Sequence, residues 1–197
     1  MTSPSPASAR RIREVMSQIG REPFLPPGQR RLAGHDYPLH IGHGQTNSQP
    51  STVVNMIDLL EVPVGAKVLD VGAGSGWTTA ILAKLVGHTG RVIGVERIPS
   101  LAAGAAEAVA SCNVPWAEVR TSIPGILGLP DEAPFDRILV SAEPLTMPAE
   151  LVDQLGPGGI MVIPVAGVMH RVRKDSAGRP RITQHGFYAF VPLITDE

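Results

Sequence analysis

A strand-like run that ends in alternating glycines restricts the fold of this chain more than any other feature. The run Lys67 to Val71 is apolar and β-branched apart from Lys67 and the acid Asp70. Three glycines at alternate positions follow it: Gly72, Gly74 and Gly76. Glycine lets a turn bend sharply and lets the backbone approach a ligand, because no Cβ intervenes. A helical apolar pattern begins at Trp77, and a helix N-terminus offers unpaired N–H groups. We therefore predict a strand, a tight turn and a helix that bind a polar ligand.

The glycine spacing and a second acid indicate a nucleoside ligand other than a nicotinamide dinucleotide. The dinucleotide fingerprint requires a glycine at position 77, where this chain has Trp77. The next strand-like run, Arg91 to Val95, is followed by Glu96, 20 residues past Gly76. At the tip of a second strand, a carboxylate can accept hydrogen bonds from ribose hydroxyls.

Composition excludes several classes of protein. The formal net charge of −1 gives no electrostatic basis for nucleic-acid binding, and no apolar run is long enough to span a membrane. Cys112 is the only cysteine, so an internal disulfide is impossible. His40 and His43 have no third ligand at a suitable spacing, so no metal site is expected. We expect a soluble, cytoplasmic, monomeric protein.

Strand-like and helix-like patterns alternate through most of the chain. Helices are expected at 8–19, 49–61, 76–86, 99–111 and 147–155. Strands are expected at 67–71, 91–95, 116–121, 135–141, 159–164, Val168 to Arg173 and Gly186 to Leu193. Repeated strand–helix units predict an α/β fold: a doubly wound, mostly parallel seven-stranded sheet in a three-layer sandwich. Residues 1–10 are expected to form a disordered tail and 11–197 a single domain, with a helical and loop cap at 11–62 and the cofactor-binding sheet core at 63–197.

Two motifs give the chain a family resemblance. The alternating-glycine turn resembles motif I of class I S-adenosylmethionine-dependent methyltransferases. The segment Pro38 to Pro50 resembles the signature of protein-L-isoaspartate O-methyltransferases, which commonly reads L-x-I-G-x-G-Q-T-I-S-Q-P. Further stretches agree with that family at 21–26, 133–140, 154–159, 162–165 and 190–193. The resemblance extends from about residue 12 to residue 194.

The resemblance implies both a reaction and a fold. The cofactor would be S-adenosyl-L-methionine, the product S-adenosyl-L-homocysteine, and the substrate an isoaspartyl residue of an aged protein or peptide. The methyl ester would collapse to a succinimide, and hydrolysis would return part of it to aspartate. The acceptor carboxylate, with a pKa of about 4, is ionised at neutral pH and needs no general base. Catalysis would rest on placement and desolvation. The family's sheet exchanges the order of the last two strands of the class I fold.

The motifs also imply individual site residues. Ser48 matches the serine that lies between cofactor and substrate, and it also occupies the position of an N-cap for the helix 49–61. Ser141 and Ala142 match the substrate-side edge. The expected cofactor-binding residues are Gln45, Thr46, Asn47, Asp70, Gly72, Gly74, Gly76, Glu96, Ser122 and Ile123.

Two departures from the family pattern leave alternatives open. Ser122 stands where the family usually has an aspartate that binds the adenine amino group, and Asn47 replaces an aliphatic residue. One alternative is a class I methyltransferase with a different acceptor. Another is a relative that binds S-adenosylmethionine without catalysis.

Overall fold

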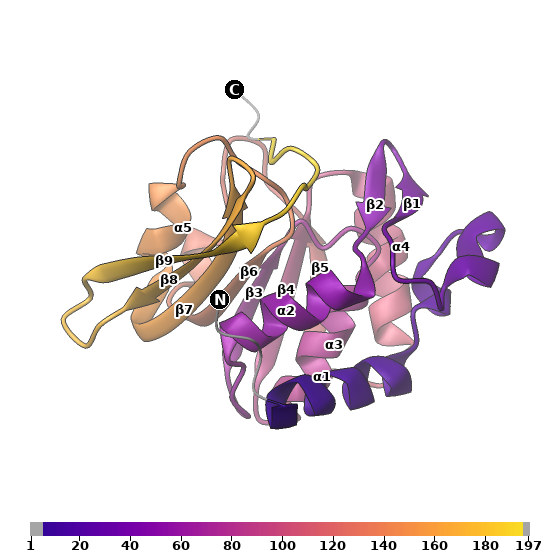
Figure 1. Cartoon of the computed structure of the whole chain (residues 1–197), viewed down its shortest axis with the longest axis horizontal. Helices are drawn as coiled ribbons and strands as arrows, with labels where there is room; N and C mark the ends of the chain where they lie inside the picture. Colours follow the sequence, from indigo (N-terminus) through magenta and orange to yellow (C-terminus); the bar gives the residue numbers. More distant parts are fainter. Residues whose placement is uncertain (1–5, 195–197) are drawn as a thin grey trace.

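A seven-stranded sheet forms the centre of the computed structural model, which describes residues 6–194. The strands lie in the order β5-β4-β3-β6-β7-β8-β9 (Figure 1). The first five run parallel, and β8 and β9 form antiparallel pairs. Their bounds are β3 Lys67–Val71, β4 Arg91–Glu96, β5 Ala117–Thr121, β6 Phe135–Val140, β7 Leu155–Val165, β8 Val168–Lys174 and β9 Pro180–Phe187. The predicted α/β class is confirmed, and β8 lies beside β7 as the family resemblance implies.

Helices cover the two faces of the sheet unequally. The α-helices are α1 Pro6–Ile19, α2 Pro50–Leu60, α3 Trp77–Val86, α4 Pro99–Ala110 and α5 Ala149–Asp153. Short 3₁₀ helices are η1 Glu22–Phe24, η2 Pro27–Leu32 and η3 Pro130–Glu132. The first four α-helices contribute to one apolar cluster, whereas α5 and the connection before β6 cover the other face. Within residues 6–194, no helix is long and apolar enough to cross a membrane.

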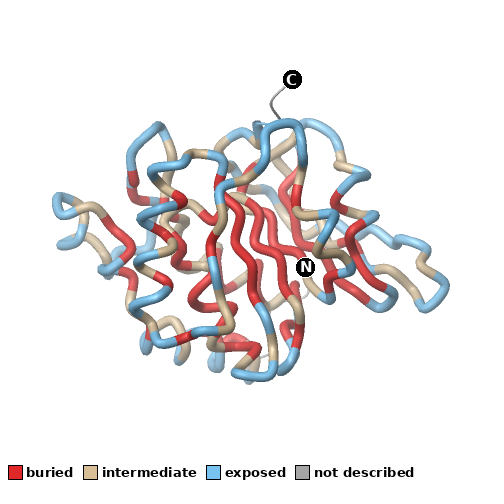
Figure 2. The backbone as a smooth tube through the Cα atoms, turned by 180° about the vertical axis from the view of Figure 1, so that it is seen from behind, coloured by how far each residue is buried: buried red, intermediate tan, exposed pale blue. Residues whose placement is uncertain are grey.

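The central strands are buried on both faces, as parallel strands between two layers require. Val68, Leu69, Ile93 and Leu139 are inaccessible to solvent. Figure 2 shows these central strands as almost continuous buried segments. Asp70 and Glu96 are buried charged residues in these otherwise apolar strands, and burying a charge is costly unless it is hydrogen-bonded.

The winding of the sheet determines where a ligand can bind. From β3 the chain passes through α3 to β4 and through α4 to β5, and then returns to the other side of β3 as β6. The direction therefore reverses between β3 and β6. In open α/β sheets, ligands bind at the carboxyl ends of the strands at such a reversal.

The segment between α1 and α2 contains more structure than its sequence indicates. The strands β1 Leu39–Gly42 and β2 Gln45–Asn47 form a hairpin beside η2. Gly44, between the strands, has φ of 70°. The sequence analysis missed this hairpin because its strands are short and its burial comes from tertiary contacts. The hairpin delivers residues 45–48 to the carboxyl edge of the sheet.

Several predicted boundaries were wrong. Helix α1 begins at Pro6, so residues 6–10 are helical, whereas residues 1–5 of the expected tail lie outside the described part. Helix α5 is shorter than 147–155, and strand β7 begins at Leu155, four residues before the predicted start at 159. Strand β9 covers 180–187 instead of 186–193. It is a largely exposed polar edge strand, so it lacks the apolar signal on which the prediction depended.

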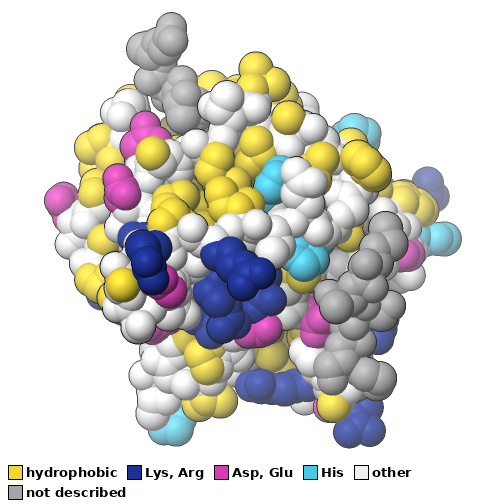
Figure 3. All heavy atoms as spheres, turned by 60° about the vertical axis from the view of Figure 1, so that its left-hand side comes forward, with side chains coloured by type: hydrophobic (Ala, Val, Ile, Leu, Met, Phe, Trp, Pro, Cys, Tyr) yellow, Lys and Arg dark blue, Asp and Glu magenta, His cyan; other side chains and the backbone are white. Residues whose placement is uncertain are grey.

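Basic side chains gather on the last two strands of the sheet, of which β9 is the edge. Strands β8 and β9 and their turn carry Arg171, Arg173, Lys174, Arg179 and Arg181. Figure 3, which brings this side of the molecule forward, shows Lys and Arg side chains gathered on it. Arg171 and Arg173 each contact one carboxylate oxygen of Glu61 at 2.6 Å. Charged side chains on an edge strand disfavour pairing with the edge of another sheet.

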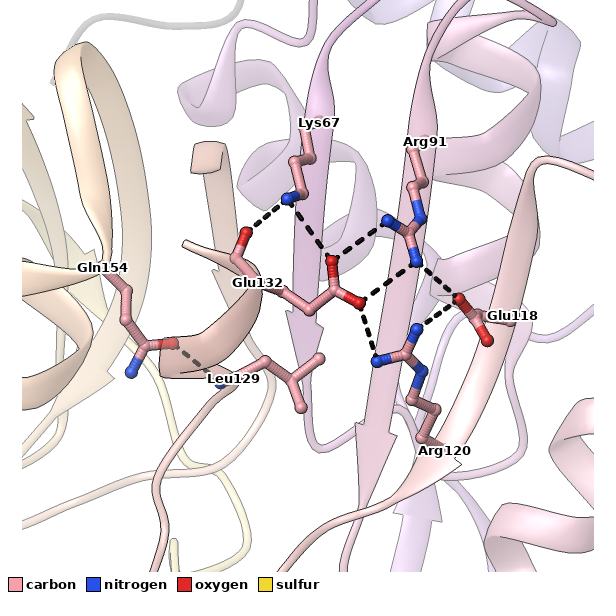
Figure 4. A network of polar contacts seen from close by, with 7 residues as sticks. All are labelled: Lys67, Arg91, Glu118, Arg120, Leu129, Glu132 and Gln154. Atoms are coloured by element: carbon pink, nitrogen blue, oxygen red, sulfur yellow. Dashed lines mark hydrogen bonds and ion pairs between the residues drawn. The ribbon is translucent and has the colours of Figure 1, made fainter. Parts of the chain in front are cut away.

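An ionic network holds the connection between β5 and β6 against the sheet (Figure 4). Glu132, in η3, forms ion pairs with Lys67, Arg91 and Arg120 from three adjacent strands. Glu118 contacts both arginines. The side chains are between 23% and 46% exposed, so solvent screens each pair and its contribution to stability is small. The connection between β5 and β6 contains only the short helix η3, and the main effect of the network is to hold η3 in position.

The close approach of α3 to β4 requires Gly94. A Cβ at Gly94 would lie 2.7 Å from the Thr79 hydroxyl oxygen, which is buried and bonded to Asp70. Gly94→Ala should lower the free energy of unfolding by about 1–3 kcal/mol. The control, Gly104→Ala, adds a Cβ that meets nothing within 4 Å on α4 and should raise it by about 0.4–1 kcal/mol. Urea denaturation measures both. Equal effects of the two variants would contradict the packing described here.

Candidate functional site

A cavity of about 230 Å³ opens at the carboxyl ends of the central strands. It lies at the reversal between β3 and β6, where the topology predicts a ligand. The structure places these predicted site residues on its wall: Gln45, Thr46, Asn47, Ser48, Gly72, Gly74, Glu96, Ser122, Ile123, Ser141 and Ala142. The predicted residues Asp70 and Gly76 lie outside the lining.

The glycine turn forms the floor of the cavity. Gly72 and Gly74 line it with φ of 77° and 55°, values in the left-handed region that glycine adopts without strain. Gly76 has a different role, because a Cβ there would lie 3.0 Å from Val109 and 3.1 Å from the Ala105 carbonyl oxygen. The third glycine thus permits α3 to pack against α4 and does not reach the ligand cavity.

Glu96 joins this turn to the end of β4. One carboxylate oxygen accepts the Gly74 N–H at 2.9 Å, and the other accepts the Ile98 N–H at 3.0 Å. The side chain is buried and lines the cavity. Two backbone donors fix its orientation, and each oxygen keeps a lone pair for a further donor. A pair of ribose hydroxyls fits this arrangement.

Asp70 lies beneath the turn and is fully buried. Its Oδ2 accepts hydrogen bonds from the hydroxyls of Thr78 at 2.8 Å and Thr79 at 2.7 Å, so the side chain anchors the first turn of α3 to β3. Its Oδ1 has no partner among the described residues. Burial raises the pKa of Asp70 to about 6 against the opposing effect of the two hydroxyls. In this structure the Asp70 side chain supports the glycine turn from below and is not part of the cavity lining.

Arg21 organises the opposite wall, and the sequence analysis did not single it out. The side chain is buried, and its Nε donates to the Asn47 Oδ1 at 2.7 Å. Its terminal nitrogens donate to four backbone carbonyls, those of His35, Tyr37, Asn47 and Ser48, at 2.9 to 3.0 Å. Burial lowers the pKa of Arg21 to about 10, so the guanidinium remains charged at neutral pH. A planar fork with five donors suits this set of acceptors.

Asn47 connects the Arg21 wall to the glycine turn. Its amide nitrogen donates to the Ser75 hydroxyl oxygen at 3.1 Å while its oxygen accepts from Arg21. The aliphatic residue usual at this position could make neither bond. The guanidinium carbon of Arg21 also lies 5.3 Å from the ring centroid of Trp77, which is both a core residue and part of the cavity wall. The two walls are therefore joined by direct contacts.

Ser48 does not cap α2 as its position suggested. The N-cap residue is Gln49, and it makes no side-chain hydrogen bond to the helix. The Ser48 carbonyl is held by Arg21, but its hydroxyl bonds to no residue between 6 and 194. Ser48 lines the main cavity and also a neighbouring cavity of about 220 Å³. The hydroxyl is thus available where the two cavities meet.

The second cavity shares one wall with the first. Thr46, Ser48, Ser141 and Val191 line both. The remaining lining comes from the residues before and within α2 and from the segment after β9: Pro38, Gln49, Thr52, Ala189 and Phe190. That segment was expected to be a strand. It is held beside β6 through Glu143, whose N–H donates to the Val191 carbonyl at 2.8 Å.

The connection after β5 closes the far end of the main cavity. The Ser122 N–H donates to the Glu96 carbonyl at 2.9 Å, which places Ser122 beside the acid. Ile123 and Ile126 line the cavity and are 56% and 42% exposed. Apolar side chains at such a rim suit the faces of an aromatic base. The site thus offers, in order, a glycine floor, a carboxylate and an apolar rim, which together fit a nucleoside.

Comparisons with known proteins agree with this geometry. A family model described as protein-L-isoaspartate(D-aspartate) O-methyltransferase matches residues 6–197. The chain is 44% identical over 191 residues to a protein-L-isoaspartate O-methyltransferase of Aeropyrum pernix, covering 95% of this chain and 74% of that protein. It is 45% identical over 192 residues to one of Methanopyrus kandleri, covering 95% and 84%.

A solved structure shares the fold. A Plasmodium falciparum protein assigned as a protein-L-isoaspartate O-methyltransferase, in complex with S-adenosyl-L-homocysteine, has a TM-score of 0.79. Identity is 24%, and the alignment covers 94% of this chain and 91% of that one. No group of three or more His, Cys, Asp or Glu side chains within residues 6–194 could hold a metal ion.

The buried Asp70 makes stability depend on pH. With a pKa of about 6 when folded and 3.8 ordinarily, this carboxyl takes up a proton on folding. Its stabilising contribution is therefore fully present below about pH 4 and is lost as pH rises through 6. Asp70→Asn cannot ionise, so its unfolding free energy relative to the unmodified chain should rise by roughly 2–4 kcal/mol from pH 4 to pH 7. Urea denaturation across this range checks it, and a constant difference would contradict the assignment.

Proposed function

The chain belongs to the protein-L-isoaspartate(D-aspartate) O-methyltransferase family, and we propose that it transfers the methyl group of S-adenosylmethionine to the α-carboxylate of L-isoaspartyl residues. The observation that carries the proposal is the shared wall. The main cavity and the second cavity meet at Ser48 and Ser141, which line both. A transfer between two bound molecules requires such a junction, because both must reach one point.

The main cavity would hold the cofactor. Gly72 and Gly74 allow close approach of the backbone, the Glu96 carboxylate accepts ribose hydroxyls, and the rim of Ile123 and Ile126 covers the base. Gln45 and Thr46 line the wall toward Ser48. When bound, the cofactor supplies an electrophilic methyl group on a sulfonium.

The second cavity would hold the acceptor. The Ser48 hydroxyl can donate a hydrogen bond to a carboxylate, and Arg21 places a buried positive charge behind the Ser48 backbone at 2.9 Å. A neighbouring cation favours an anionic acceptor in this position. Ser141 lies on the same shared wall and can serve as a second donor to the carboxylate.

The residues at the junction suit a reaction without acid–base catalysis. An acceptor carboxylate is ionised at neutral pH, so no side chain has to remove a proton. The roles left to the protein are orientation and exclusion of water. Orientation depends on Ser48, and the segment Ala189 to Val191 covers the acceptor side.

We also propose a single domain with a cap at 11–62 on a sheet core at 63–197, acting as a monomer in the cytoplasm. The cap supplies Arg21 and residues 45–48, whereas the sheet core supplies the glycine turn and Glu96.

Methyl transfer from labelled S-adenosylmethionine to a synthetic isoaspartyl peptide tests the proposal, with the matching aspartyl peptide as the control. Base-labile label on the isoaspartyl peptide alone is the expected result. Label on neither peptide, while S-adenosyl-L-homocysteine still binds in calorimetry, would indicate another acceptor. Absence of binding would indicate that the altered loop after β5 has lost the cofactor.

Ser48→Ala in the same assay tests the role of the hydroxyl. Loss of an orienting contact at the reacting group should lower kcat by about 10- to 100-fold. Binding of S-adenosyl-L-homocysteine should stay within about twofold, since the Arg21 bonds to this segment involve backbone oxygens. The matched control is Ser176→Ala, in the exposed turn before β9, which should leave kcat unchanged. A kcat for Ser48→Ala equal to that of this control would show that the hydroxyl has no role in transfer.

A further inference from the structure

Glu150 is an acid on the cavity wall that no function described so far uses. Of the described residues that line the main cavity, only Glu96 and Glu150 carry carboxylates. The Glu96 oxygens accept the N–H groups of Gly74 and Ile98. The Glu150 side chain is exposed and makes no hydrogen bond or ion pair with any residue from 6 to 194. Its carboxylate is therefore free to accept a donor from a ligand.

A buried amide, that of Gln154, holds the backbone of Glu150. The Gln154 Nε2 donates to the Leu127 carbonyl at 2.8 Å and to the Glu150 carbonyl at 3.0 Å. Its Oε1 accepts the Leu129 N–H at 2.7 Å, the contact drawn beside η3 in Figure 4. One amide thus joins α5 to the connection after β5. Glu150 stands beside the loop that closes the far end of the cavity.

The loop has little room to move relative to Glu150. A Cβ on Gly128, whose φ is 77°, would lie 2.4 Å from the Gln154 Oε1 and 2.7 Å from Leu151. This close packing keeps the loop against α5. From residue 122 to 130 the connection contains no acid. An acceptor at this end must therefore be a hydroxyl, a backbone carbonyl or the carboxylate of Glu150.

The chemistry of adenine favours the carboxylate. The base presents an exocyclic amino group with two hydrogens, and a charged acceptor forms a stronger hydrogen bond with it than a neutral one does. With the ribose at Glu96, the base would lie along Ile123, toward the lining residues Gly128 and Glu150. We propose that Glu150 accepts a hydrogen bond from the adenine amino group and thereby selects adenosyl over 6-oxopurine nucleosides. This inference rests on the proposed use of the main cavity for S-adenosylmethionine.

Calorimetry with two ligands tests this role without requiring methyl transfer. S-adenosyl-L-homocysteine has the amino group, whereas S-inosyl-L-homocysteine has an oxygen at that position and a hydrogen on the adjacent ring nitrogen. The unmodified protein should prefer the adenosyl ligand. Glu150→Gln offers an amide donor as well as an acceptor, so it should lower the preference about tenfold, mostly by weakening the adenosyl ligand. The control Asp153→Asn removes the same charge from an exposed position on α5 outside the lining and should keep the preference.

The outcomes separate this inference from the proposed function. Tight adenosyl binding with the same preference in Glu150→Gln as in Asp153→Asn would overturn the role of Glu150 and leave the function in place. A loss of preference in Ser122→Ala with none in Glu150→Gln would assign the contact to the hydroxyl and would also overturn it. Failure of the unmodified protein to bind S-adenosyl-L-homocysteine would overturn both proposals.

Discussion

The site depends above all on one buried guanidinium. Arg21 comes from the turn after α1, far in the sequence from the strands whose ends form the cavity. Its five hydrogen bonds hold residues 35–48 in place. Burying a cation is costly unless its donors find acceptors, and each of the three guanidinium nitrogens of Arg21 has at least one. This requirement couples the position of Ser48 to the folding of the whole cap. The backbone of residues 35–48 is thereby held in one conformation and forms one wall of the cavity.

The two walls meet through a small number of polar contacts around one turn. Asn47 connects Arg21 to Ser75, and Glu96 connects the Gly74 N–H to the end of β4. Asp70 anchors the helix that follows the turn. The cofactor side and the acceptor side therefore share a rigid centre, and a rearrangement of either one is transmitted to the other through hydrogen bonds. A reaction that relies on placement benefits from such a centre.

The sequence was sufficient for the fold, and most of the predicted site residues line the cavity; physical reasons explain the exceptions. The glycine turn and Glu96 could be predicted because strand, turn and helix follow each other locally. The supporting role of Asp70 depends on hydroxyls eight and nine residues away in α3, and that of Arg21 on carbonyls up to 27 residues away. Glu150 is 20 to 28 residues away from the loop it faces. The polar edge strand β9 was misplaced because its pattern resembles a loop. Contacts of this kind arise only from tertiary packing.

Amide hydrogen exchange in Arg21→Lys tests the dependence of the site on this guanidinium most directly. Lysine keeps the charge but replaces the planar fork with a single ammonium, so it cannot reach the same acceptors. We expect amides of residues 38–48 to exchange at least about tenfold faster, with β3 and β4 unchanged and kcat reduced. Arg30→Lys, which alters an exposed arginine with one bond to the Leu25 carbonyl, is the control. Unchanged exchange at 38–48 in Arg21→Lys would contradict the central role of Arg21.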